Sequence, residues 1–300
     1  MAGKSTVIIA LGGNALIREG EKGTYSEQLA HVGEIAKQVA KISKAGYEVV
    51  ITHGNGPQVG NLLIQQKAGA KEVPAQPMDV CGAMSQGQIG YMLQQKLGET
   101  AKNPVVTLIT QVLVDSKDPA FKHPTKPVGP FYEEKSRGMV WDAGRGFRKV
   151  VPSPDPKKIV ESKAIKAIVD SDVIVIASGG GGIPVIRKKG RLLGVEAVID
   201  KDLAAERLAT SLNAEVLLIL TAVPQVFLDF GTKRQRPIRK LNQSLAKIYL
   251  RQGQFAEGSM GPKILAAVRF VQHGGKRAII TSPELAYDAL AGKAGTVVSW

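Results

Sequence analysis

The chain has 300 residues, 44% of them hydrophobic, which is enough for one large core or two modest ones and excludes a fibre or a disordered chain. Its formal net charge of +14 would attract nucleic acids, acidic surfaces and small anions alike, so charge alone selects no partner. The single cysteine, Cys81, excludes an intramolecular disulfide and suits a reducing compartment, from which we expect a cytoplasmic protein.

The first half of the chain alternates short apolar runs with segments of helical periodicity. Residues 6–11 predict a buried strand, and this run is too short to be a signal sequence or to cross a membrane. There follow a helix capped by Ser26 and stopped by Gly46, a strand at 47–52, helices at 57–67 and 83–97, and a strand at 105–110. This alternation is typical of βαβ units and predicts a doubly wound, mostly parallel sheet.

Residues 115–156 interrupt the alternation. Seven of the sixteen prolines fall here, together with four glycines. The segment is too long for an ordinary connection between two elements. We therefore expect a functional lid or a small protruding subdomain at this point of the chain.

The second half returns to alternating elements. The pattern predicts a helix at 157–170, a strand at 173–177 and a hairpin over 185–195 that turns at 188–190. A helix at 202–213, strands at 216–221 and 278–281, and a helix that Pro262 begins between those strands extend the same architecture.

The most basic segment lies between Lys233 and Arg251, where seven Lys or Arg residues occur without an acidic residue. Aromatic residues are not interleaved with these charges as a base-stacking surface would require. A solvated basic face is the better interpretation, and nucleic-acid binding is a minor alternative.

Three glycine-rich turns directly follow predicted strands: Gly12-Gly13-Asn14, Gly54-Asn55-Gly56, and residues 179–182, which include Gly180 and Gly181. Because the carboxyl ends of parallel strands share one edge of a sheet, these turns can converge there with backbone N–H groups facing an anion. For any single turn, a tight connection without function is nearly as good an explanation. Three turns in the same topological position favour a phosphate site.

The standard nucleotide fingerprints fail in this chain. Gly3-Lys4-Ser5 lacks the first glycine of a Walker A loop and precedes its strand instead of following it. The turn that begins at Gly54 has one residue too many for G-x-G-x-x-G, and the turn at Gly179 has no third glycine at the required position. The chain is therefore neither a P-loop enzyme nor a typical dinucleotide binder.

Two lysines lie where phosphoryl transfer would use a positive charge. Lys201 stands between Asp200 and Asp202 at the start of a predicted helix, and Lys263 follows Pro262 at the start of another. An acidic helix start is, taken alone, more often a plain N-cap, and a solvent-facing lysine at a helix start has only a small cost. The unfavourable position of Lys263 near a positive helix end nevertheless indicates that an anion is bound there.

The remaining chemistry-bearing residues point away from metal and covalent catalysis. The four histidines are scattered without the spacing of a transition-metal site, and we interpret His53, beside a glycine turn, as structural or substrate-adjacent instead of a general base. No G-x-S-x-G elbow is present and Cys81 has no motif-level partner, so we expect direct transfer without a covalent intermediate.

The ordered set of these motifs closely resembles the carbamate kinases of the amino-acid-kinase family over nearly the whole chain. Each glycine turn alone is a weak signal, and the ordered set is highly specific. The blocks that carry the resemblance are residues 10–16, 53–60, 82–87, 125–132, 178–184, 196–204 and 258–263.

This resemblance implies a three-layer αβα sandwich with a mostly parallel central sheet and a small protruding lid. It implies one domain over residues 1–300, with an N-terminal acceptor lobe to about residue 170, the lid at about 115–156, and a C-terminal nucleotide lobe from about 171. It further implies a cytoplasmic homodimer of arginine metabolism that converts ATP and carbamate reversibly to ADP and carbamoyl phosphate with Mg²⁺, without direct protein ligation of the metal.

The resemblance also assigns roles to individual positions. Lys201 and Lys263 would stabilise the transferring charge, Asp202 would orient both lysines, and Lys126 would reach from the lid to the acceptor. The substrate and phosphate would be bound by Gly12, Gly13, Asn14, Gly54, Asn55, Gly56, Gly180 and Gly181. The nucleotide would be bound by Thr221, Val223, Phe230, Ala256, Met260 and Gly261.

Carbamate already carries an anionic oxygen, so it can attack phosphorus without a general base. The chain departs from the family at Ala222, where many relatives have an aspartate near the nucleotide.

Two other hypotheses stand beside this one. A kinase of the same fold could act on an amino-acid carboxylate or uridylate, which the Lys126 segment disfavours. A nucleotide sensor or basic nucleic-acid binder could retain the fold, which Lys201, Asp202 and Lys263 disfavour.

Overall fold

The computed structural model of the chain describes residues 4–12, 15–18, 20–141 and 146–300. Within these residues the largest sheet runs in the order β15-β17-β16-β12-β1-β2-β9-β3. Parallel pairing joins β1 to both β2 and β12, β12 to β16, and β9 to both β2 and β3, which confirms the predicted sheet. Its strands are β1 (Thr6–Leu11), β2 (Glu48–His53), β3 (Val105–Thr107), β9 (Ile174–Ile176), β12 (Val216–Leu220), β15 (Lys240–Asn242), β16 (Arg277–Thr281) and β17 (Thr296–Ser299).

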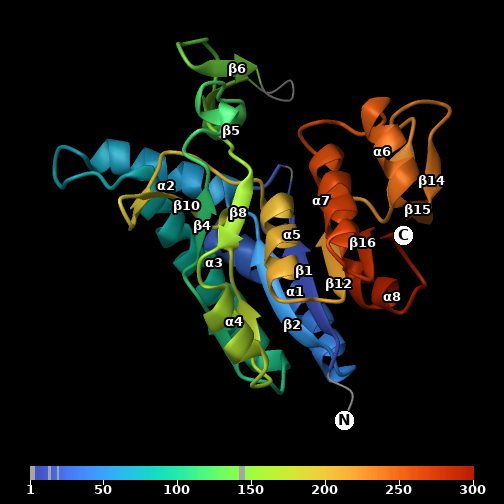
Figure 1. Cartoon of the computed structure of the whole chain (residues 1–300). Coiled ribbons are helices and arrows are strands. Elements are labelled where there is room, and N and C mark those ends of the chain that lie inside the picture. Colours follow the sequence, from blue (N-terminus) through green and yellow to red (C-terminus); the bar gives the residue numbers. More distant parts are fainter. Residues whose placement is uncertain (1–3, 13–14, 19, 142–145) are drawn as a thin grey trace.

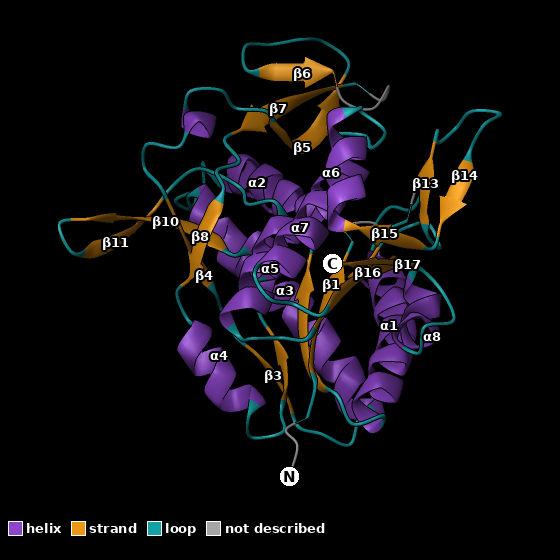
Figure 2. Ribbon diagram, turned by 45° about the vertical axis from the view of Figure 1, so that its right-hand side comes forward, coloured by secondary structure: helices purple, strands orange, loops and turns teal. Residues whose placement is uncertain are grey.

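Helices cover both faces of this sheet and make three layers (Figure 2). Side chains alternate along β1, so that Ile8 and Ala10 pack with one helical layer while Val7, Ile9 and Leu11 pack with the other. The first layer contains α4 (Ser162–Val169), α5 (Lys201–Ser211) and α7 (Met260–Gln272). The second contains α1 (Tyr25–Lys44), α3 (Met78–Thr100) and α8 (Ala286–Leu290).

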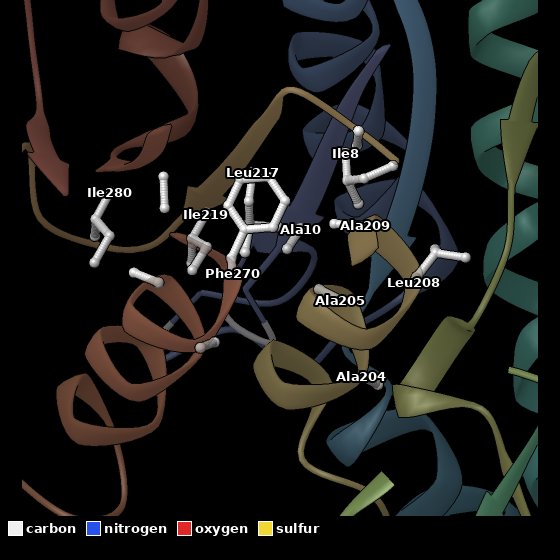
Figure 3. Close-up of a cluster of buried hydrophobic side chains, with 14 of the residues drawn as sticks. Ile8, Ala10, Ala204, Ala205, Leu208, Ala209, Leu217, Ile219, Phe270 and Ile280 are labelled. Carbon is white, nitrogen blue, oxygen red and sulfur yellow. The ribbon is translucent and has the colours of Figure 1, made fainter. Parts of the chain in front are cut away.

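The core beneath α5 is built from small side chains. Ala204, Ala205 and Ala209 lie among Ile8, Leu217 and other apolar residues of the sheet (Figure 3). Because alanine adds little volume between helix and strand, α5 can pack closely against the sheet. This packing places the start of α5, with Lys201 and Asp202, beside the central strands.

The segment between β4 (Gln111–Val114) and β8 (Pro156–Ile159) protrudes from the body (Figure 1). It contains η2 (Pro119–Phe121) and an antiparallel sheet of β5 (Lys126–Tyr132), β7 (Phe147–Val151) and β6 (Met139–Trp141) in that order. We call residues 115–155 the lid. Its base packs through Val128 and Val151 against Met78, Leu63 and Val198 of the body.

Further elements flank the main sheet. The strands β4 and β8 form a second sheet with the hairpin of β10 (Ile183–Lys188) and β11 (Arg191–Gly194), which the sequence predicts correctly. The hairpin of β13 (Val226–Leu228) and β14 (Arg236–Ile238), and the helices α2 (Gly56–Gly69), α6 (Gln243–Arg251), η3 (Gly179–Gly181) and η4 (Pro283–Leu285), complete the fold. Within the described ranges, no helix is both long enough and apolar enough to cross a membrane.

Several element boundaries differ from the sequence predictions, among them the strand predicted at 105–110, which ends at Thr107; three of the differences concern α1, α3 and β8. Thr24, not Ser26, caps α1, because its side chain accepts from the Glu27 N–H while the Glu27 carboxylate accepts from the Thr24 N–H. The third helix begins at Met78 instead of residue 83, directly after Pro77. Residues 156–159 form a strand that pairs with β4 instead of the first turn of a helix, since a distant partner offers them ladder hydrogen bonds.

Candidate active site

The carboxyl end of β1, with Gly12, lies at the point where the strand order changes direction across the sheet. From β1 the strand order proceeds to β2 on one side and to β12 on the other, which is the crevice where open α/β sheets bind ligands. A Cβ at Gly12 would lie 2.9 Å from the Leu220 carbonyl oxygen, so only glycine lets the two strand ends approach this closely. Gly54 joins the same edge through its N–H, which donates to the Leu11 carbonyl at 3.1 Å.

The turns after β2 and β9 are in direct contact. The Thr52 hydroxyl donates to the Ser178 carbonyl at 2.8 Å. Gly180 has a φ of +65°, and a Cβ there would lie 2.2 Å from Asn55 Nδ2, so both the backbone and the close approach require glycine. Asn55 Nδ2 in turn donates to Ser85 Oγ at 2.7 Å, which fixes the amide beside the turn.

Gln86 is a buried clamp for these turns, and the sequence analysis gave it no role. Its Nε2 donates to the carbonyls of Gly179 at 2.9 Å and Thr110 at 3.1 Å, while its Oε1 accepts from the Thr110 N–H at 2.8 Å. The Thr110 hydroxyl also accepts from the Ser178 N–H. The signal in the sequence is a pair of polar residues, Ser85 and Gln86, in the middle of a helix that packs against the sheet.

His53 is buried at the end of β2, and its ring lies directly beside Gly179 of the β9 turn. Its Nδ1 lies 3.0 Å from the Gly54 carbonyl, which can only accept, so Nδ1 carries the proton of the neutral ring. Burial lowers the pKa of His53 to about 4, against a smaller opposing effect of the Gly54 hydrogen bond. A neutral, buried imidazole agrees with the structural interpretation of His53.

The His53 pKa predicts a pH dependence of stability. The folded-state pKa of about 4 lies below the ordinary value of 6.5, so the unfolded chain binds the extra proton first as pH falls. The stabilising effect is complete above pH 6.5 and is lost as pH falls toward 4, with a total of roughly 3 kcal/mol. Denaturant titrations across this window should give a flatter slope of unfolding free energy against pH for His53→Gln. A slope for His53→Gln equal to that of the wild-type protein would contradict the assignment.

Asp202 binds both predicted lysines. Lys201 Nζ lies 2.5 Å from its Oδ1 and Lys263 Nζ lies 3.1 Å from its Oδ2, although Lys263 is 61 residues away. Asp202 and Lys263 are 3% and 9% exposed. The three residues, which we call the lysine cluster, stand at the first turns of α5 and α7, where helix dipoles add further positive potential. The arrangement carries a net positive charge and fits a bound anion.

Burial and mutual attraction decide the protonation states of the cluster. Burial alone would raise the pKa of Asp202, but Lys201 and Lys263 hold this pKa below its ordinary value, so Asp202 is ionised. Burial lowers the pKa of Lys201, and the Asp202 carboxylate opposes that effect while the positive Lys263 adds to it. An anionic ligand would favour the charged form of Lys201 in the same way as Asp202.

Two contacts join the lysine cluster to the rest of the predicted site. A Cβ at Gly181 would lie 2.6 Å from the Ile199 carbonyl, so the β9 turn packs directly against the residues that lead into α5. Lys126 of the lid donates to Asp200 Oδ2 at 2.8 Å, which brings the lid to the start of the same helix. The sequence did not predict this contact between Asp200 and the lid.

The predicted nucleotide-binding residues lie in the segments after β12 and β13 and around the start of α7. Thr221 continues from β12 and its N–H donates to the Thr281 carbonyl at 2.8 Å, with Val223 two residues further on. The segments of Phe230 and Ala256 are tied together, because Gln254 accepts from the Asp229 N–H at 2.9 Å. Ala256 accepts from the N–H of Gly261, next to Met260 at the start of α7. Phe230 is 64% exposed. The predicted positions Gly13 and Asn14 lie outside the described residues.

The donor groups of this site fit a metal that arrives with a phosphate ligand. The described part of the chain has no group of three or more His, Cys, Asp or Glu residues arranged to hold a metal ion. Both Asp202 oxygens contact lysines, and the Asp200 oxygens contact Lys126 and backbone N–H groups. Mg²⁺ commonly keeps several waters and binds substrate phosphates. Asp200 and Asp202 are the carboxylates that could order those waters.

A separate cavity of about 490 Å³ lies among residues of α1, α2 and α3 and includes Gln28, Gln58 and Tyr91. None of the predicted site residues lines it. The candidate active site is therefore defined by the convergence of turns and charges and not by the size of a cavity.

Comparisons with known proteins show the family to which this chain belongs. Residues 5–282 match the model of the amino acid kinase family. The chain is 56% identical to a carbamate kinase of Pyrococcus horikoshii, with 98% of each chain covered, and 48% identical to a carbamate kinase of Trichomonas vaginalis, with 97% of this chain and 98% of that one covered.

Solved structures give the same result. A structure of carbamate kinase from Giardia lamblia bound to AMP-PNP superposes with a TM-score of 0.93 at 46% identity, over 100% of this chain and 99% of that chain. A structure of the same enzyme bound to citric acid gives a TM-score of 0.92.

Proposed function

Because this chain belongs to the carbamate kinases of the amino acid kinase family, we propose that it moves a phosphoryl group reversibly between ATP and carbamate, in line and without a covalent enzyme intermediate. In the forward direction, a carbamate oxygen forms a bond to the γ-phosphorus while the bond from that phosphorus to the leaving ADP oxygen breaks. The observation that carries the proposal is the lysine cluster, in which one ionised aspartate holds two lysines at two helix starts.

The described residues can perform the tasks that this transfer requires. Backbone N–H groups at the turns after β1, β2 and β9 would hold the phosphoryl oxygens, and Lys201 and Lys263 would neutralise the charge that develops during transfer. Lys126 would contact the carbamate or the transferring group from the lid. Neutral, buried His53 is not required as a base, since the attacking oxygen of carbamate is already anionic.

Magnesium bound to the nucleotide phosphates would supply additional charge neutralisation to the transferring group. The segments around Phe230 and Ala256 would hold the nucleoside, with the exposed Phe230 ring available for stacking. Ala222 lies between Thr221 and Val223 at this edge and adds no charge to it. We therefore assign nucleotide affinity to the aromatic and backbone contacts of these segments.

The reverse reaction provides the test. Purified protein supplied with ADP, Mg²⁺ and carbamoyl phosphate should form ATP, which a coupled luminescence assay measures. Acetyl phosphate, offered as an alternative donor, serves as the control for specificity. Failure to form ATP from carbamoyl phosphate, or equal rates with both donors, would contradict the assignment.

We also propose that the protein forms a homodimer through the exposed face of α2 and α3. Val80, Met84 and Tyr91, which helical spacing places on one face of α3, are exposed, and Ile64 of α2 is exposed as well. Apolar side chains gathered on one face of a monomer commonly mark a protein interface. Light scattering on the purified protein should give twice the chain mass of 31.9 kDa, and a monomeric mass would exclude the dimer.

A further inference from the structure

Asp200 connects the lid to the lysine cluster, and this contact with Lys126 was not part of the site predicted from the sequence. We propose that Asp200 is a positioning residue, whose carboxylate holds Lys126 over the start of α5 so that the lysine meets the carbamoyl or transferring phosphoryl group. This inference rests on the proposed function, and it adds a determinant of acceptor binding to it.

The two oxygens of Asp200 have separate tasks. Oδ1 caps α5 by accepting from the N–H groups of Asp202 at 2.9 Å and Leu203 at 3.4 Å. Oδ2 accepts from Lys126 Nζ at 2.8 Å across 74 residues of sequence. The Asp200 side chain is 13% exposed and that of Lys126 is 36% exposed. The cap fixes the direction of the carboxylate, and the fixed carboxylate then fixes the lysine.

Lys126 needs such a partner because of its position. It is the first residue of β5 in the protruding lid, and 36% of its side chain is exposed. A lysine side chain loses up to about 2 kcal/mol of rotamer entropy when it is ordered, so an unpaired Lys126 would sample many directions. The ion pair with Asp200 restricts these directions before substrate binds, which is the role of preorganisation in an active site.

Charge balance gives a second reason for an acidic residue at this position. Lys201 and Lys263 already share the charge of Asp202, so a third lysine nearby would be repelled without a further carboxylate. Asp200 lies close enough to Lys201 to favour the charged form of that lysine. Asp200 therefore lets Lys126 approach a region that is otherwise positive. The three lysines carry more positive charge than the two carboxylates neutralise, and the remaining charge is available to the anionic substrate.

The lid also has a second ion pair with the body, which serves as a comparison. Asp155, at the end of the lid, accepts from Arg269 of α7 at 2.5 Å. Arg269 lies in the last turn of α7, whereas Lys263 lies in the first turn. The Asp155 pair therefore anchors the lid away from the lysine cluster, and of these two lid pairs the Lys126 pair is the one at the predicted phosphoryl site.

The decisive variant is Asp200→Asn. Asparagine caps helices as well as aspartate does, so the variant keeps the α5 cap and removes the charge that holds Lys126. Because a hydrogen bond to a charged group is lost, we expect kcat/KM for carbamoyl phosphate to fall roughly tenfold. The loss should lie mainly in KM for carbamoyl phosphate, with KM for ADP and the thermal midpoint unchanged.

A double-variant cycle with Lys126→Met separates positioning from general structural damage. If Asp200 acts through Lys126, then Asp200→Asn causes no additional loss in the Lys126→Met background. The matched controls are Lys149→Met, which removes another lid charge, and Asp172→Asn, which breaks the exposed pair with Lys4. Both controls should retain wild-type kinetics.

The outcomes distinguish this inference from the proposed function. Wild-type ATP formation together with an unimpaired Asp200→Asn, or with losses that multiply in the double variant, would overturn the role of Asp200 and leave the kinase intact. Wild-type protein that forms no ATP from carbamoyl phosphate would overturn the proposed function and this inference together.

Discussion

The single variants Lys201→Ala and Lys263→Ala should each form ATP from ADP and carbamoyl phosphate on the order of a thousandfold more slowly than the wild-type protein. Each lysine stands at the start of a helix with little of its side chain exposed, 13% for Lys201 and 11% for Lys263, and its charge would lie beside the oxygens of the transferring group. Removal of either one takes away half of the positive charge that these two lysines supply to the developing charge. The effect should appear in kcat, because the interaction strengthens in the transition state.

Steady-state kinetics on both variants, with circular dichroism to verify the fold, measure this effect. Lys163→Ala is the matched control, since Lys163 is an exposed lysine of α4 on the same helical layer. It should retain the wild-type rate. Wild-type rates for Lys201→Ala and Lys263→Ala would exclude the lysine cluster from the chemistry.

Asp202→Asn should have an effect on both rate and stability. The two lysines would lie buried beside each other without the charge that separates them, and loss of one partner of a buried ion pair costs about 3 kcal/mol of unfolding free energy. Attraction from Asp202 also supports the charged form of Lys201, so its pKa should fall further in the variant. We expect loss of activity comparable with that of the lysine variants.

Inorganic phosphate gives this prediction a specific signature. An anion bound between the lysines replaces the missing carboxylate, so phosphate should raise the denaturation midpoint of Asp202→Asn more than that of wild type. Asp170→Asn, at the exposed end of α4, controls for loss of a surface carboxylate and should respond as wild type does. An Asp202→Asn protein with wild-type stability and no added response to phosphate would contradict the electrostatic account.

Much of the architecture follows from local patterns in the sequence. Short apolar runs predicted β1, β2, β9, β12 and β16, the first three of which lead into glycine turns, and the parallel arrangement of these strands places their carboxyl ends at one edge. The rule that glycine turns gather at such an edge then predicted that the turns near Gly12, Gly54 and Gly180 share one region. The structure gives contacts among the strand ends and turns there, while their binding roles stay predictions.

The contacts that the sequence did not predict are non-local. Asp200 and Lys126 are 74 residues apart, and Gln86 reaches Gly179 across 93 residues. Nothing in the spacing around either residue reports its partner. The same limit explains β8, where pairing with β4 overrides the helical pattern that begins near Lys157. The cap of α1 could not be predicted from the sequence pattern either. Both Thr24 and Ser26 are acceptable cap residues, and only the backbone conformation decides between them.

A crystal structure of this protein with AMP-PNP and Mg²⁺ tests the central claim most directly. The account predicts that the γ-phosphate lies within hydrogen-bond distance, about 3 Å, of the Nζ atoms of Lys201 or Lys263 and of backbone N–H groups in the turns after β1 or β2. A γ-phosphate bound in another region, with both lysines still held only by Asp202, would contradict it.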